Sequence, residues 1–292
     1  MTSLNSVPVT ARVSGANDDR IILGLSRSLV YTILILIVIV QAFPFVWMLS
    51  ASLSSQREVF TSFLPTRLDF SSYARVWVAI DLPQHLLNSL HVTGLTVSIV
   101  VIVSTLAGYA FARFRFPGRD LIFYVFIAAM MIPGQAILIP MFRFLKNIGL
   151  LNTLTGLSLS YLGSAVAFSI FLMRSFFVSL PKELGDAAKM DGANEFGVFW
   201  HVYMPLAKPG IATVVIIQSM NVWNEFMFAN TFISTPGTKT IQSAVFQAVG
   251  QYATDYSTLS AGLMLALLPV VAIFLALQRQ FVHGLTAGAV KG

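Results

Sequence analysis

Residues 28–49 read SLVYTILILIVIVQAFPFVWML and lie in an interval, from Arg27 to Arg57, that contains no charged residue. An α-helix needs about 20 apolar residues to cross the roughly 30 Å of hydrocarbon in a bilayer. The apolar residues here fall on every side of a helix and do not alternate with polar ones, which argues against a strand of a membrane barrel. This stretch therefore predicts a transmembrane helix.

The composition of the whole chain agrees with this stretch. Of its 292 residues, 56% are hydrophobic and 10% are charged, whereas soluble domains are about 25% charged. This composition excludes an ordinary soluble enzyme, a disordered protein and a nucleic-acid-binding protein. The net charge of +6 is then best interpreted as an orientation signal and as contact with lipid headgroups.

Long intervals without charge predict six membrane-spanning helices. They run from Arg27 to Arg57, Asp81 to Arg113, Asp120 to Arg143, Lys146 to Arg174, Lys208 to Lys239 (interrupted by Glu225) and Asp255 to Arg279. With the N-terminus inside, twelve Lys and Arg residues fall on the inner side and six on the outer side, so both termini are predicted to be cytoplasmic. The predicted class is an all-α polytopic membrane protein with tails at 1–27 and 284–292 and a six-helix domain at 28–283.

The sequence lacks the common motifs of nucleotide-binding, metal-binding and nucleophilic catalytic sites. It contains no Gly-x-x-x-x-Gly-Lys-Ser/Thr phosphate loop, no His-Glu-x-x-His pair, no Gly-x-Ser-x-Gly turn and no cysteine. We therefore expect no catalytic residue, no metal site and no cofactor on this chain. A membrane-embedded enzyme stays open as a hypothesis without a recognisable nucleophile, base or metal set.

The longest predicted cytoplasmic segment, residues 180–209, is patterned as two short helices. Pro181 suits the first turn of one helix, which can end at Gly192. One face of that helix carries Leu184, Ala187 and Ala188. Asn194 can cap a second helix, with aromatic residues at 196, 199, 200 and 203, before Pro205 ends the pattern. The pattern alone leaves two roles open, a hairpin that packs on its own bundle or a surface that another protein approaches.

The spacing in this segment resembles a loop signature of permease subunits of bacterial ABC importers. That signature is Glu-Ala-Ala, three residues, Gly, nine residues, Ile-x-Leu-Pro. Here Asp186-Ala187-Ala188 is followed after three residues by Gly192 and after nine more by Val202-Tyr203-Met204-Pro205. Residues 108–118, 223–226 and 284–292 also look like the carbohydrate branch of the binding-protein-dependent transport family, and in particular like its maltose-type second permease.

The resemblance implies a function and a set of partners. The function is ATP-driven import of a carbohydrate (a sugar, oligosaccharide or related polyol) across a bacterial cytoplasmic membrane by alternating access, with an importer core at about 85–283. The partners are two ATPase subunits that bind ATP and Mg, a second, different permease subunit and an extracytoplasmic solute-binding protein. Residues expected to couple to the ATPase are Asp186, Ala187, Ala188, Lys189, Asp191, Gly192, Ala193 and Pro205. In the C-terminal tail, Gly288 and Lys291 are expected to contact the ATPase pair.

Polar residues in the fifth predicted helix suggest a route for the solute. Those on one helical face are Gln218, Asn221, Asn224 and Glu225, with Trp223 beside them as an aromatic surface. Glu225 is the only acidic residue in a predicted span, where a carboxylate is energetically costly. It can contact the solute, or pair with a polar group on a neighbouring helix and so hold or gate the bundle. As the alternative function, it can be the coupling carboxylate of an ion-driven secondary transporter.

Overall fold

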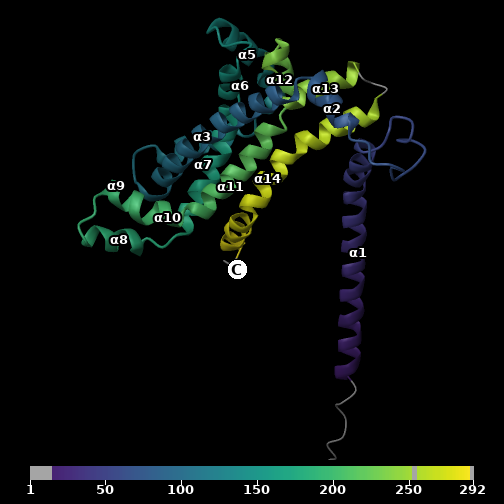
Figure 1. Ribbon diagram of the computed structural model, residues 1–292. Helices are drawn as coiled ribbons and strands as arrows, with labels where there is room; N and C mark the ends of the chain where they lie inside the picture. The colour runs from purple at the N-terminus through teal and green to yellow at the C-terminus, as the bar shows by residue number, and fades with distance from the viewer. Residues whose placement is uncertain (1–14, 252–254, 290–292) are drawn as a thin grey trace, which may run out of the picture.

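The protein is built from helices (Figure 1). A computed structural model describes residues 15–251 and 255–289, and in those residues no strand is present. In chain order the elements are α1 (Gly15–Ser52), α2 (Ser71–Ala79), α3 (Leu82–Arg113), α4 (Arg119–Ala129), α5 (Gly134–Asn147), α6 (Leu154–Ser160), α7 (Leu162–Ser179), α8 (Glu183–Met190), α9 (Glu195–Gly197), the π-helix η1 (Val198–Tyr203), α10 (Met204–Leu206), α11 (Lys208–Trp223), α12 (Met227–Phe232), the short helix η2 (Pro236–Thr238), α13 (Ile241–Gln251) and α14 (Tyr256–Ala289). The all-α prediction is confirmed.

In the described part of the chain, four helical stretches are long and apolar enough to cross a membrane. They are residues 28–52 of α1, all of α3 and α7, and residues 256–276 of α14. Two bent helix pairs raise the number to six if each pair is one span: α4 with α5 at 97°, and residues 195–206 with α11 at 68°. The chain is therefore a multi-pass membrane protein, and the side on which each terminus lies stays a prediction.

Helix α3 packs closely against α7 and also contacts α11 and α6. The approach to α7 is closest at Gly108, where an added Cβ would lie 2.6 Å from the Cβ of Met173 and 2.9 Å from the backbone nitrogen of Arg174. Small residues allow such close helix packing in membranes, where there is little hydrophobic driving force between helices. This contact fixes the neighbouring ends of α3 and α7, on which the candidate site is built.

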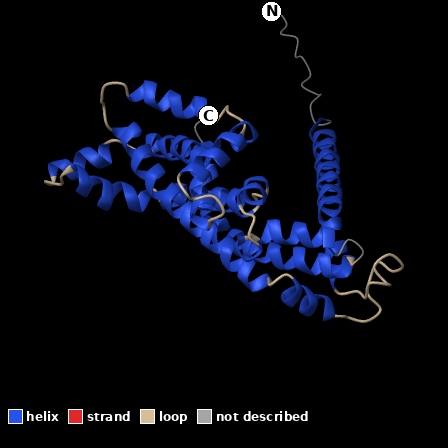
Figure 2. Ribbon diagram, turned by 90° about the horizontal axis from the view of Figure 1, so that it is seen from above, coloured by secondary structure: helices blue, strands red, loops and turns tan. Residues whose placement is uncertain are grey.

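Helix α1 stands apart from this bundle in both views (Figures 1 and 2). Most of residues 28–49 are exposed, whereas Ser50, Ala51 and Ser52 at its C-terminal end are buried. That end is held by packing on α14 and by a 2.8 Å hydrogen bond between the hydroxyl groups of Ser52 and Tyr73. The exposed apolar length of α1 must face lipid or another membrane-embedded chain.

Three of the six predicted spans are not continuous helices. The third breaks between α4 and α5, because Pro133 takes an extended conformation and cannot donate to the preceding turn. The fourth is divided at Tyr161 between α6 and α7, and the fifth ends at Trp223, with no proline at either break. The first and last helices extend into the predicted tails at 1–27 and 284–292, because α1 begins at Gly15 and α14 ends at Ala289.

Candidate functional site

The 180–209 loop contains the two predicted helical segments, joined by a turn at Gly192. That residue has φ +88°, a left-handed conformation that glycine adopts without strain. The N–H of Gly192 donates to the carbonyl of Lys189 at 3.0 Å, and that of Ala193 donates to the carbonyl of Ala188 at 3.0 Å, which closes α8. The side-chain oxygen of Asn194 accepts from the N–H of Gly197 at 2.8 Å and so caps the second segment.

Aromatic residues attach this loop to the bundle. The ring of Tyr109 in α3 lies 4.8 Å from Phe199 and 5.4 Å from Tyr203, measured between ring centroids, and 5.5 Å from Phe177 at the end of α7. Gly185 in α8 leaves room for Tyr203, since an added Cβ would lie 2.8 Å from the tyrosine hydroxyl. The loop is therefore packed on the ends of α3 and α7.

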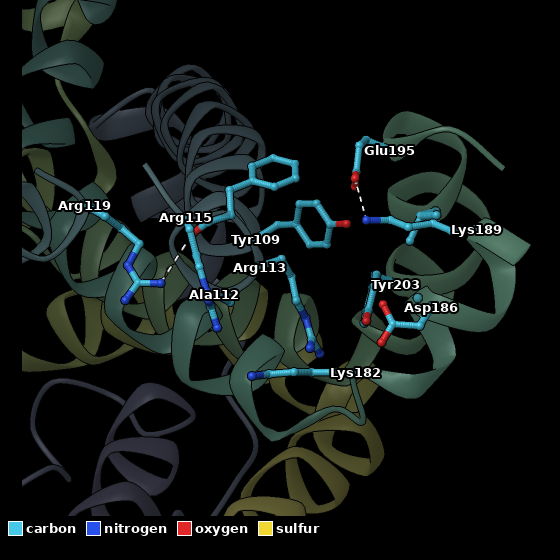
Figure 3. Close-up of a pocket in the computed structure, with 13 residues that line it drawn as sticks. Tyr109, Ala112, Arg113, Arg115, Arg119, Lys182, Asp186, Lys189, Glu195 and Tyr203 are labelled. Carbon is cyan, nitrogen blue, oxygen red and sulfur yellow. Dashed lines mark hydrogen bonds and ion pairs between the residues drawn. The ribbon is translucent and has the colours of Figure 1, made fainter. Parts of the chain in front are cut away.

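Arg113, whose position Figure 3 shows, joins the same three elements through polar contacts. One guanidinium nitrogen donates to the carbonyls of Phe177 at 2.7 Å and Leu180 at 2.8 Å, at the C-terminal end of α7. The guanidinium also lies over the ring of Tyr203, 4.4 Å from its centroid. Neither Tyr109 nor Arg113 was among the predicted site residues, although both lie in the 108–118 stretch and, four positions apart, share a helical face.

Six of the eight loop residues expected to couple to a partner are exposed: Asp186, Ala187, Lys189, Asp191, Gly192 and Pro205. The other two, Ala188 and Ala193, are partly buried and pack on the aromatic cluster. A salt bridge of 2.5 Å between the amine of Lys189 and the carboxylate of Glu195 ties the two arms of the loop together, and the hydrogen bond raises the pKa of Lys189. The tip of the loop is thus exposed while its two arms are held together.

A second feature is a cavity of about 210 Å³ between α7 and α11. Three of the five predicted path residues line it, namely Gln218, Asn221 and Glu225. The other two do not. Trp223 is buried and donates its indole N–H to the carbonyl of Ala266 in α14 at 3.0 Å, and Asn224 caps the end of α11.

Glu225 lies in the break between α11 and α12, outside any helix. Its carboxylate accepts hydrogen bonds from the hydroxyl of Tyr161 at 2.5 Å and from the backbone N–H groups of Phe228 at 2.8 Å and Ala229 at 3.1 Å. These contacts hold the start of α12 against the junction of α6 and α7. The geometry favours the pairing role of Glu225 over direct solute contact. No sequence signal marked Tyr161 as its partner.

Gln218 and Asn221 differ in how far their amides are already satisfied. The amide nitrogen of Gln218 donates to the hydroxyl of Ser169 at 3.0 Å and to the carbonyl of Ala165 at 3.4 Å. Asn221 is exposed to the cavity, and its amide forms no hydrogen bond within residues 15–251 and 255–289. Among the three path residues that line the cavity, Asn221 is thus the one whose side chain forms no hydrogen bond with a described residue.

The predicted C-terminal contact is described only in part. Gly288 lies in the last turn of α14, and Lys291 lies outside the described residues.

A family model described as "Binding-protein-dependent transport system inner membrane component" matches residues 101–286, which include the 180–209 loop and the residues that line the α7–α11 cavity. The chain belongs to this family. It is therefore an inner-membrane transport component that functions with a solute-binding protein, and the family resemblance seen in the sequence is confirmed. The family comprises transport subunits and not enzymes.

Relatives of this transport component are similar over nearly the whole chain. A probable ABC transporter permease, YurM of Bacillus subtilis, is 34% identical over 90% of the chain and 88% of its own length. A diacetylchitobiose uptake permease, NgcG of Streptomyces coelicolor, is 32% identical over 95% and 92%. Among solved structures, a chain of a bacterial ABC transporter that imports the acidic polysaccharide alginate superimposes with a TM-score of 0.77 at 26% identity, covering 94% of this chain and 100% of that one.

Proposed function

We propose that this chain is the permease subunit of an ATP-driven importer and that it carries a carbohydrate inward by alternating access. The observation that carries the proposal is the 180–209 loop, whose exposed tip is joined through Tyr109 and Arg113 to the ends of α3 and α7. A surface that is open to a partner and fixed to transmembrane helices can convert a partner's movement into a movement of the bundle.

The partners follow from this role. Two ATPase subunits hold ATP and Mg, and one of them receives the tip of the loop at Gly192. A second, different permease subunit completes the membrane part, and its contact covers part of the exposed apolar length of α1. The solute-binding protein delivers the carbohydrate to the opposite side of the membrane.

A carbohydrate suits the chemistry of the α7–α11 cavity. Hydroxyl-rich solutes need amide donors and acceptors and a flat apolar surface to pack against. Asn221 offers a free amide, and the ring of Phe168 lines the same cavity. α7 lines the cavity near Ala165 and contacts the loop through Phe177, whose ring centroid lies 6.5 Å from that of Tyr203. A movement of the loop is thereby transmitted to the solute path.

Uptake of labelled oligosaccharides into vesicles that contain the purified complex tests this proposal. We expect uptake only with the solute-binding protein and with ATP on the ATPase side, and no loss when proton and sodium gradients are collapsed. Uptake without the ATPase that stops when a gradient is collapsed would establish the secondary transporter instead. The three hydrogen bonds to Glu225 already count against its use as a coupling carboxylate.

A further inference from the structure

A cavity of about 480 Å³ lies between the α3–α4 turn and the 180–209 loop (Figure 3). Its walls carry five basic residues, Arg113, Arg115, Arg119, Lys182 and Lys189. The acidic residues in the wall are Asp186 and Glu195. Basic residues thus outnumber acidic ones in a space large enough for a phosphate group.

Some of these charges are compensated within the protein. Lys189 pairs with Glu195 at 2.5 Å, and Arg119 pairs with Asp120 at 2.9 Å. By contrast, the side chains of Arg115 and Lys182 form no hydrogen bond or ion pair with any described residue. Uncompensated positive charge therefore remains on that side of the cavity.

Arg113 is a further cation of this wall, and its hydrogen-bonding capacity is only partly used within the described residues. Two of its contacts are made by one terminal nitrogen, but its Nε is buried and has no hydrogen-bond partner among the described residues. A buried donor without a partner is energetically unfavourable. Figure 3 shows the charged ends of Arg113, Arg115 and Lys182 directed toward the same space, with Asp186 on the far side of it.

The position of the cavity indicates the source of the anion. Its walls are the ends of membrane helices, because Arg113 ends α3, Arg119 begins α4 and Lys182 follows α7. A neighbouring hollow of about 310 Å³ shares Arg115 and Arg119 and continues to Leu121. The exposed surface of α4 beyond it is apolar, with Leu121, Ile122 and Val125.

We propose that this cavity binds the phosphate of an anionic lipid headgroup, as in phosphatidylglycerol, from the leaflet next to the 180–209 loop. Arg115 and Lys182 contact the phosphate, Arg113 lies behind them, and the acyl chains lie along the exposed face of α4. A membrane lipid has direct access to these cations, because the neighbouring hollow joins Arg115 and Arg119 to the exposed Leu121 of α4. The bound lipid connects the loop to the bilayer surface.

Lipid binding to the purified complex tests the assignment. The complex is placed in micelles of a neutral detergent, and bound phosphatidylglycerol is titrated by native mass spectrometry. The double variant Arg115→Gln with Lys182→Gln should bind about 25-fold more weakly, because each basic residue at a membrane surface contributes about fivefold. Arg115→Gln alone should lose about fivefold, which keeps the test available if the double variant does not fold.

Two matched variants serve as controls. Arg143→Gln with Lys146→Gln removes the same two kinds of charge from exposed positions of α5, at the opposite end of the molecule (Figure 1), and should leave phosphatidylglycerol binding unchanged. Arg115→Lys with Lys182→Arg keeps both charges and should retain most of the affinity.

Three results would overturn the assignment. One is phosphatidylglycerol binding that is equal in the double variant and the wild type. Another is binding of inorganic phosphate to the lipid-free complex as tightly as phosphatidylglycerol, which would make a free phosphate the ligand. The last is loss of ATPase copurification in the double variant with unchanged lipid affinity, which would assign the cavity to an acidic side chain of the partner.

Discussion

At the scale of the residue, Glu225 shows how hydrogen bonds accommodate a carboxylate in a membrane protein. Its oxygens accept one side-chain and two backbone hydrogen bonds, and hydrogen bonds to a charged group are among the stronger ones in proteins. The residue therefore joins the end of α11, the start of α12 and the junction of α6 and α7. These hydrogen bonds offset the energetic cost of placing a carboxylate in a membrane protein.

Replacing Glu225 should thus destabilise the fold. We expect Glu225→Ala to lower the free energy of unfolding by about 2 kcal/mol and Tyr161→Phe by about 1 kcal/mol. The double variant should be no less stable than Glu225→Ala, since the tyrosine then has no acceptor to lose. Unfolding in mixed micelles with SDS, followed by tryptophan fluorescence, measures the three values.

Asn221→Ala is the matched control for Glu225, because it removes a polar side chain from the same cavity without breaking a described hydrogen bond. We expect a change in unfolding free energy below about 0.5 kcal/mol and a clear loss of carbohydrate uptake. Normal uptake by Asn221→Ala would remove this residue from the solute path. Wild-type stability in Glu225→Ala would contradict the pairing role.

At the scale of the element, the contact between α3 and α7 decides the geometry of the site. Gly108 brings the backbones together, and the residues that hold the loop follow within about one turn. Any separation of these helices therefore moves Tyr109 and Arg113 away from Phe177.

Two glycines of α3 allow a controlled test of this contact. Gly108→Ala places a methyl group against Met173 and the backbone of Arg174, which should reduce stability by about 1–3 kcal/mol. Gly94→Ala, on the same helix, meets nothing within 4 Å and should be neutral or stabilising by up to about 1 kcal/mol. Thermal unfolding of both variants in one detergent checks the difference. Equal melting temperatures would show that α3 and α7 are not tightly packed at Gly108.

At the scale of the whole molecule, the two ends of the bundle are built from different elements. One end carries the 180–209 loop and the basic cavity, and the other carries α5, α12 and α13 (Figure 1). The α7–α11 cavity lies along the helices that connect them. A perturbation at the loop should therefore affect the interaction with a partner without affecting folding.

Gly192→Asp tests this separation. It places a charged side chain in the exposed turn, and we expect weaker copurification of the ATPase and slower ATP-driven uptake with normal membrane insertion. Gly149→Asp is the control, because Gly149 also has a positive φ (+73°) and open space around it. The backbone strain is alike in the two variants, and only position 192 lies in the loop. Normal ATPase copurification with Gly192→Asp would argue against a coupling role.

The sequence predicted the features that depend on local patterns. Gly192 was predicted to end one helix and Asn194 to cap the next, and the structure has both features. The helix ends at Tyr161 and Trp223 could not be predicted, because no proline marks them and the hydrogen-bond partners found there, Glu225 and Ala266, are distant in sequence. A charge-free interval shows where hydrocarbon can surround the chain, but not whether the helix inside it is continuous.

Arg113 illustrates the same limit for the site. In the sequence it counts as one inner-side basic residue of the positive-inside pattern. Its hydrogen-bond acceptors are 64 and 67 residues away in the sequence. The residues next to Arg113 in the chain therefore do not indicate that it joins α3 to the end of α7.

Helix α7 contacts the solute cavity near one end and Arg113 near the other, and this arrangement has a thermodynamic consequence. The helix lines the solute cavity near Ala165 and is held by Arg113 through the carbonyl of Phe177. If docking of a protein on the loop changes the affinity for the solute by some factor through α7, then the solute must change the affinity of the docking protein by the same factor. Under the proposed function, binding of the solute in the cavity and docking of the ATPase on the loop would therefore be linked equilibria.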